Sequence, residues 1–185
     1  MNKPNVPSPW DLQEDNLHAD CRIFEVRKQR LRRRYDGVEG EFFVLNTNDW
    51  VNVLALTPDQ EIVLVRQFRY GSKEQSLEPP GGVVERGEDP LVAGLRELQE
   101  ETGYVGESPE LLGMVRPNAA ILSNRCHVML VRNVEKKAAL NFDQHEELAT
   151  ELYPVADLKN MIRNGKITHS IGLNSLLMLL LKLDL

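Results

Sequence analysis

The chain has 185 residues, of which 42% are hydrophobic and 27% are charged, and its formal net charge is −6. This length and composition indicate one soluble globular domain with a sizeable core. The acidic balance makes nucleic acid and anionic membranes poor partners for it.

The ends of the chain and its cysteines favour a reduced, cytoplasmic setting. The first residues, MNKPNVPSPWDLQEDN, are polar and proline-rich and contain no apolar signal core. The most apolar stretch, residues 175–185, is too short to span a bilayer and is interrupted by Lys182, so we expect a buried terminal helix rather than a membrane anchor. The two cysteines, Cys21 and Cys126, form no CxxC pair and no disulfide framework.

The first half of the chain predicts strands. We expect residues 1–20 to form a loose arm and residues 21–185 to form a single domain. Four extended segments follow: CRIFEVRKQRLRRR, EFFVLN, WVNVLAL and EIVLVRQFRY. The last three are rich in Val, Phe and Leu, as strands commonly are. The turn TPDQ, with Pro58 at its second position, joins the last two of these as a hairpin.

The second half mixes strands and helices. After a helix near residue 90, ELLGMVRP and RCHVMLVRNV predict two more strands, and NFDQHEELATELYPV predicts a polar loop that leads into a short strand. ADLKNMIRNG has helical spacing and a glycine stop, and the Leu-rich C-terminus predicts the last helix. This mixture indicates an α/β or α+β layered domain.

The helix near residue 90 has clear ends and an unusual charge. Asp89 is a good N-cap, Pro90 a good first residue, and Gly103 suits a left-handed stop. Stepping around the helix at about 100° per residue places the leucines on one side and three glutamates on the other. The leucines are Leu91, Leu95 and Leu98, and the glutamates are Glu97, Glu100 and Glu101.

Such a cluster of acids costs free energy. Like charges four residues apart repel by a few tenths of a kcal/mol, and each acid near the helix C-terminus opposes the macrodipole by up to about 1 kcal/mol. A solvated acidic face is one interpretation. The glycines before the helix favour a second one, in which carboxylate and carbonyl oxygens bind Mg²⁺ and the cation neutralises a substrate's phosphates.

The fixed positions of this segment resemble the Nudix box of the Nudix hydrolase family. The matching residues are Gly82, Glu88, Arg96, Glu97, Leu98, Glu100, Glu101, Gly103 and Tyr104, and the box covers 23 of the 185 residues. Tyr104 is a departure, since an aliphatic residue is more usual there. Every other fixed position of the box is matched.

The resemblance implies a fold and a chemistry. The fold is a mixed β-sheet between helices, with the box as loop–helix–loop, and the reaction is Mg²⁺- or Mn²⁺-dependent hydrolysis of a nucleoside diphosphate linked to another group. Glu88 and Arg96 become structural partners that orient the glutamates. The implied metal ligands are Glu97, Glu100, Glu101 and the Gly81 carbonyl, and Glu100 is also a catalytic candidate.

The segments just before the box narrow the resemblance to one group within the family. VLVRQFRYGS and LEPPGG look like the ADP-ribose pyrophosphatase and nucleoside diphosphate sugar group. In that group the arginine of the QFR strand and the glutamate before the glycines lie near the substrate or brace one another. Arg69 and Glu78 therefore become substrate-site candidates, against the alternative that Arg69 is a surface strand residue.

Hydrolysis also needs a group that takes a proton from water. In the resembling group this residue often comes from an acidic loop after the box, and FDQHEELATELYPV is the matching stretch. Its candidates are His145, Glu146 and Glu147, of which we favour Glu146 and then Glu147. The group often has a glutamate near Gln144, where this chain has an amide, and a solvated acidic loop is the alternative.

The stretch RKQRLRRR contains six basic residues in eight, at positions 27–34. A nucleic-acid patch is disfavoured because no aromatics are interleaved, so we expect a strand that faces phosphate or a partner subunit. In the resembling group, N-terminal strands commonly cross to the other subunit of a homodimer. The corresponding strands of this chain, within residues 21–47, are therefore expected at a dimer contact. Arg34 is therefore a substrate-binding candidate, and Tyr35 or Trp50 either stacks on a base or packs in the core.

His127 and His169 lie in apolar segments and are expected to be packed rather than to bind a ligand, and Cys126 to be a buried apolar residue. The function predicted is hydrolysis of a nucleoside diphosphate sugar, such as ADP-ribose or GDP-mannose, to a nucleoside monophosphate and a sugar phosphate. The alternatives are a nucleoside triphosphate, a dinucleoside polyphosphate or an RNA cap as the substrate, or a sensor that binds a nucleotide sugar without catalysis.

Overall fold

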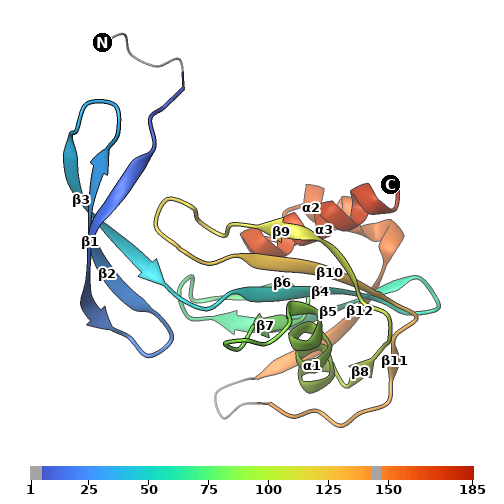
Figure 1. The fold of residues 1–185 in the computed structure, drawn as a ribbon. Coiled ribbons are helices and arrows are strands. Elements are labelled where there is room, and N and C mark those ends of the chain that lie inside the picture. The colour runs from blue at the N-terminus through green and yellow to red at the C-terminus, as the bar shows by residue number, and fades with distance from the viewer. Residues whose placement is uncertain (1–5, 143–146) are drawn as a thin grey trace. The chain divides into compact units, whose positions relative to one another are not determined.

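The computed structural model describes residues 6–142 and 147–185. The chain forms two compact units (Figure 1). The first unit contains residues 1–48 and 118–124, and the second contains residues 49–117 and 125–185. The sequence placed a boundary near residue 20, whereas the chain passes from the first unit to the second at residue 48.

The first unit is built on a three-stranded antiparallel sheet in the order β1-β2-β3. Its strands are β1 (Trp10–Asp20), β2 (Glu25–Arg33) and β3 (Glu39–Asn46). The expectation of a loose arm over residues 1–20 is wrong for Trp10–Asp20, which pair along their whole length with β2. The physical reason is the backbone ladder with β2, in which Asp11 and Glu14 of β1 lie opposite Arg32 and Arg30.

The basic stretch is largely neutralised within this unit. Most of its cations pair with acids on neighbouring strands or in the adjoining turn, in these pairs: Arg27 with Asp15, Lys28 with Glu41, Arg30 with Glu14 and Glu39, Arg33 with Asp36, and Arg34 with Asp11. Exposed pairs of this kind contribute little to stability individually. These pairs neutralise most of the positive charge of residues 27–34, so the segment needs no nucleic-acid partner to do so.

The second unit contains a mixed sheet in the order β12-β5-β4-β10-β9, with β6 paired to β5 and β7 paired to β4. Its strands are β4 (Trp50–Leu56), β5 (Glu61–Arg69), β6 (Glu74–Glu78), β7 (Gly81–Val83), β9 (Glu110–Val115), β10 (Cys126–Arg132) and β12 (Leu148–Pro154). Strands β4 and β10 are parallel, and the other pairs are antiparallel. The predicted hairpin between β4 and β5 is confirmed. A separate small pair joins β8 (Tyr104–Val105) to β11 (Glu135–Lys136).

Helices cover both faces of this sheet (Figure 1). Helix α1 (Pro90–Thr102) packs on one face, and a 3₁₀ turn (Val155–Asp157), α2 (Leu158–Arg163) and α3 (Ser170–Lys182) lie on the other. Alternate residues of one strand enter the two cores, since Val53 packs toward α1 and Leu54 toward α2 and α3. The predicted mixed sheet between helices is therefore confirmed.

The C-terminal helix is buried as expected, because Leu176 and Leu179 have no exposed surface. None of the helices in the described part of the chain is long and apolar enough to cross a membrane.

Candidate active site

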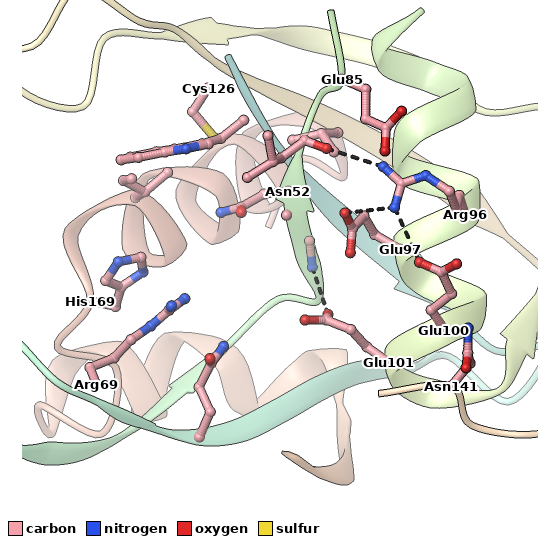
Figure 2. Close-up of a pocket in the computed structure, with 17 residues that line it drawn as sticks. Asn52, Arg69, Glu85, Arg96, Glu97, Glu100, Glu101, Cys126, Asn141 and His169 are labelled. Atoms are coloured by element: carbon pink, nitrogen blue, oxygen red, sulfur yellow. Dashed lines mark hydrogen bonds and ion pairs between the residues drawn. The ribbon is translucent and has the colours of Figure 1, made fainter. Parts of the chain in front are cut away.

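A cavity of about 680 Å³ lies within the second unit (Figure 2). One wall comes from α1 and presents acidic side chains, and the opposite wall comes from β4, β5 and the residues that begin α3. The short strand β7 passes between them. The lining residues are Trp50, Val51, Asn52, Gln67, Arg69, Gly81, Gly82, Val83, Glu85, Arg96, Glu97, Glu100, Glu101, Cys126, Asn141, His169 and Ile171.

Small residues bring α1 close to the sheet. Ala93 and Gly94 are buried, and a Cβ added at Gly94 would lie 2.1 Å from the Met129 sulfur. Leu91 and Leu95 are only partly buried and pack against the edge of the core. The helical wheel placed the leucines on one side and the glutamates on the other. The structure buries Ala93, Gly94 and Glu101 on the glutamate side, and this side forms one wall of the cavity.

Arg96 connects the acids of this wall. Its Nε donates to Glu88 at 3.1 Å, and its Nη1 donates to Glu97 at 2.9 Å and to Glu100 at 3.1 Å. The hydrogen bond to Glu88 raises the pKa of Arg96 above its ordinary value despite partial burial, and the carboxylates of Glu97 and Glu100 add to this effect. The planar guanidinium thus fixes the orientation of the neighbouring carboxylates, a geometry that lysine cannot reproduce.

Two glycines adjoin the same carboxylates. Gly81 donates its backbone N–H to Glu101 Oε2 at 2.9 Å, and a Cβ at Gly81 would lie 2.0 Å from the carbonyl oxygen of Val51. A Cβ at Gly82 would lie 2.5 Å from the carboxyl group of Glu97. Gly81 therefore needs glycine, because the clash is with the backbone of β4, whereas a side chain at Gly82 would require the Glu97 carboxylate to move.

The donor chemistry of this wall fits a hard divalent cation. In residues 6–142 and 147–185, no three His, Cys, Asp or Glu side chains are arranged to hold a metal ion together. The reason is that Glu97 and Glu100 bond to Arg96, whereas Glu101 turns toward Gly81. Mg²⁺ is commonly bound by only one or two carboxylates, with water and substrate phosphates completing its shell, so the available oxygens suffice.

Behind the opposite wall, the buried carboxylate of Glu78 contacts the side chains of two lining residues, Arg69 and His169. Arg69 donates to Glu78 through Nε at 2.8 Å and Nη2 at 2.7 Å, and His169 Nδ1 lies 2.8 Å from Glu78 Oε2. Burial raises the pKa of Glu78, but hydrogen bonds from Arg69 and His169 outweigh it and lower that pKa to about 2. Glu78 is 2% exposed and is therefore a fixed anion that orients both partners.

This arrangement corrects the prediction for His169, which was expected to pack in an apolar segment. It lies at the N-cap of α3 and lines the cavity. The prediction failed because α3 is apolar in sequence, whereas its first turn begins beside Glu78, 91 positions earlier in the chain. His127 is partly buried and pairs with Asp49.

The other predicted site residues are more dispersed. Trp50 lines the cavity and is only partly buried, so it is not a plain core residue. Arg34 and Tyr35 belong to the first unit, where Arg34 pairs with Asp11. His145 and Glu146 lie outside the described residues, and Glu147 is exposed and is not a lining residue of the cavity.

Sequence reasoning missed several polar lining residues, among them Asn52, Gln67 and Asn141. Asn52 had a usable signal, since it is a lone amide within the apolar strand WVNVLAL. Its Nδ2 donates to Ser175 Oγ at 3.1 Å, which ties β4 to α3. Gln67 had no signal of this kind because it follows Arg66 in its strand, and Asn141 had none because it lies in a segment without regular helix or strand.

A family model described as the NUDIX domain matches residues 47–171, about two thirds of the chain. The chain belongs to the Nudix family. The matched segment contains both walls of the cavity, from Trp50 to Ile171. The acidic helix is thus the helix of the Nudix box that the sequence resembled.

Relatives of known name share part of this Nudix chain. The methanol dehydrogenase activator of Bacillus methanolicus is 37% identical over 101 residues, and the ADP-ribose pyrophosphatase of Bacillus subtilis (strain 168) is 34% identical over 101 residues. Each match covers 53% of this chain and 55% of the relative, so the chain spans about half the length of these proteins. A crystal structure of an ADP compounds hydrolase matches 98% of this chain and 97% of its own, with a TM-score of 0.85 and 19% identity, and so has the same fold.

Proposed function

We propose that this Nudix protein hydrolyses the pyrophosphate bond of a nucleoside diphosphate sugar of the ADP-ribose or GDP-mannose type. The products are a nucleoside monophosphate and a sugar phosphate. The observation that carries the proposal is one cavity with Glu97, Glu100 and Glu101 on one wall and Arg69 on the other. The printed names of the Bacillus subtilis relative and of an ADP-sugar pyrophosphatase from Mus musculus, 43% identical over 70 residues, support this substrate class.

The charges of the cavity account for the need for a metal. A diphosphate entering beside three glutamates is repelled unless a cation lies between them. We assign Mg²⁺ to this position, with Mn²⁺ as a substitute, held by carboxylates of Glu97, Glu100 and Glu101 and by the Gly81 carbonyl. When bound, such a cation neutralises phosphate charge and lowers the pKa of a water molecule.

The remaining residues bind and orient the substrate. Arg69 is held by Glu78 with its guanidinium directed into the cavity, so it can contact a phosphate oxygen without losing its buried partner (Figure 2). Trp50 offers a partly exposed ring on which a base can stack. Arg34 and Tyr35 stay candidates for binding the nucleotide through the first unit, in a homodimer that works in the cytoplasm.

Proton removal from the attacking water needs a carboxylate or histidine within hydrogen-bond reach. We retain Glu146, then Glu147, as the candidate bases, and Glu100 as a catalytic residue on the cavity wall. The separate variants Glu146→Gln and Glu147→Gln distinguish these roles. The base variant loses turnover at neutral pH and retains substrate affinity, whereas the other variant keeps both.

The experiment that tests the function is product analysis in ¹⁸O-labelled water, with Mg²⁺ and a panel of substrates. The panel contains ADP-ribose, GDP-mannose, a nucleoside triphosphate, a dinucleoside polyphosphate and capped RNA. Release of a labelled monophosphate from a nucleotide sugar supports the proposal. Preferred turnover of another panel member, or binding of ADP-ribose without hydrolysis, would overturn it in favour of a different substrate or of a sensor.

A further inference from the structure

His169 is placed where a bound substrate would meet it. The residue precedes α3 and lines the cavity beside Arg69, on the wall opposite the glutamates (Figure 2). Its side chain is partly exposed, at 28%, although the side chain of Glu78 beneath it is only 3% exposed. The imidazole therefore lies between a buried anion and the open cavity.

The contacts of the ring engage only one of its two nitrogens. Nδ1 lies 2.8 Å from Glu78 Oε2 and 3.4 Å from the backbone nitrogen of Gly172. The shorter contact places a proton on Nδ1, which donates to the carboxylate. Nε2 makes no hydrogen bond to any residue that the structure describes, and this side of the ring is left for a ligand.

Arg69 repeats the same pattern on the other side of Glu78. Its Nε and Nη2 both donate to the carboxylate, and its Nη1 has no hydrogen-bond partner within the described ranges. Two neighbouring side chains thus each use one end to hold the same buried carboxylate. Their other ends supply hydrogen-bonding groups at the cavity surface.

The position of His169 is rigid as well as exposed. An added Cβ at Gly172 would lie 3.2 Å from Pro79 and 3.8 Å from the Glu78 backbone, so the first turn of α3 lies against the segment that carries Glu78. Glu78 itself is in β6, which pairs with β5 along the residues that lead to Arg69. A side chain fixed in this way binds a ligand with little loss of rotamer entropy.

We propose that His169 is a substrate-binding residue whose Nε2 hydrogen-bonds an oxygen of the nucleotide sugar while its Nδ1 stays on Glu78. The inference rests on the proposed function and adds a specific contact to it. The oxygen belongs either to the diphosphate, which accepts from a protonated Nε2, or to a sugar hydroxyl, which can donate to Nε2 when only Nδ1 carries a proton.

The variant His169→Asn separates this role from a structural one. The asparagine amide can replace Nδ1 in donating to Glu78, and asparagine is a good N-cap for α3, whereas nothing in its side chain replaces Nε2. We expect the KM for ADP-ribose to rise about tenfold, the loss of one hydrogen bond, with kcat changed less than about threefold. The matched control is His127→Asn, which changes a partly buried histidine that does not line the cavity and should leave both constants near those of the wild type.

A binding measurement in the presence of Mg²⁺ identifies the oxygen. The Kd values of ADP and of a non-hydrolysable ADP-ribose analogue are compared for the wild type and His169→Asn. A tenfold weakening for both ligands assigns the contact to the diphosphate, and a weakening for the analogue alone assigns it to the distal sugar. Unchanged Kd and KM values in His169→Asn would overturn the inference and leave the proposed function intact. A wild-type protein that neither binds nor hydrolyses any nucleotide sugar would overturn the proposed function itself, and the His169 contact with it.

Discussion

Glu101 accepts a hydrogen bond from the backbone N–H of Gly81 at 2.9 Å, and this bond ties the end of the acidic helix to the strand in front of it. Glu101 is 4% exposed, so its carboxylate is held rather than solvated. The bond requires β7 to lie directly against β4, and only glycine permits that approach. The close approach of β7 to β4 at Gly81 therefore also fixes the position of the Glu101 carboxylate in the cavity.

Replacing Gly81 with alanine tests this link. The new Cβ would lie 2.0 Å from the Val51 carbonyl oxygen, so β7 must move and the bond to Glu101 must lengthen. We expect Gly81→Ala to lower the free energy of unfolding by about 1–3 kcal/mol and to reduce turnover, measured by urea denaturation and product assay. Gly71→Ala is the control, because nothing lies within 4 Å of its added Cβ. Wild-type stability and turnover in Gly81→Ala would contradict the argument.

Glu101→Gln should abolish turnover without unfolding the protein. The amide oxygen still accepts from Gly81, but the negative charge that attracts a divalent cation is gone. We expect kcat with Mg²⁺ to fall roughly 100-fold or more, while the denaturation midpoint stays close to that of the wild type. Glu107→Gln, at an exposed position outside the cavity, should retain wild-type kcat. Turnover of Glu101→Gln near the wild-type rate would remove this residue from the site.

The ion pair between the buried Glu78 and the partly exposed Arg69 predicts a pH dependence of stability. Glu78 has a pKa of about 2 in the folded protein, against an ordinary value of 4.5, so the unfolded chain takes up a proton first as the pH falls. Its contribution is fully present above pH 4.5 and is lost toward pH 2, and it amounts to about 3 kcal/mol.

Urea denaturation between pH 6 and pH 3 measures this contribution. The wild type should lose stability more steeply with acid than Glu78→Gln, whose amide does not titrate. Glu74→Gln, on the same strand and exposed, should keep the wild-type slope. Equal slopes in the wild type and Glu78→Gln would show that Glu78 is not held as a low-pKa anion.

Local chemistry explains what the sequence could predict. The acidic helix begins and ends where its caps indicated, since the Asp89 side chain accepts from Leu91 and Gly103 has a φ of 70°. The hairpin between β4 and β5 and the burial of the terminal helix also follow from neighbouring residues. The Nudix box was recognisable for the same reason, because its fixed positions lie within one short segment.

Long-range contacts explain what the sequence could not predict. Strand β1 is paired with β2, where the Arg27 side chain reaches Asp15 at 2.9 Å, although its own composition resembles that of a loose arm. The role of His169 depends on Glu78, which is remote in sequence. The close packing of Gly94, on the glutamate side of α1, against Met129 is a contact that a helical wheel does not contain.

The most direct test of the account is a crystal structure with Mn²⁺ and a non-hydrolysable ADP-ribose analogue, using the anomalous signal of the metal. We expect a peak at roughly 2.1 Å from carboxylate oxygens of Glu97, Glu100 or Glu101, between the acidic wall and the diphosphate. A structure with the analogue bound in the cavity and no metal beside these glutamates would contradict it.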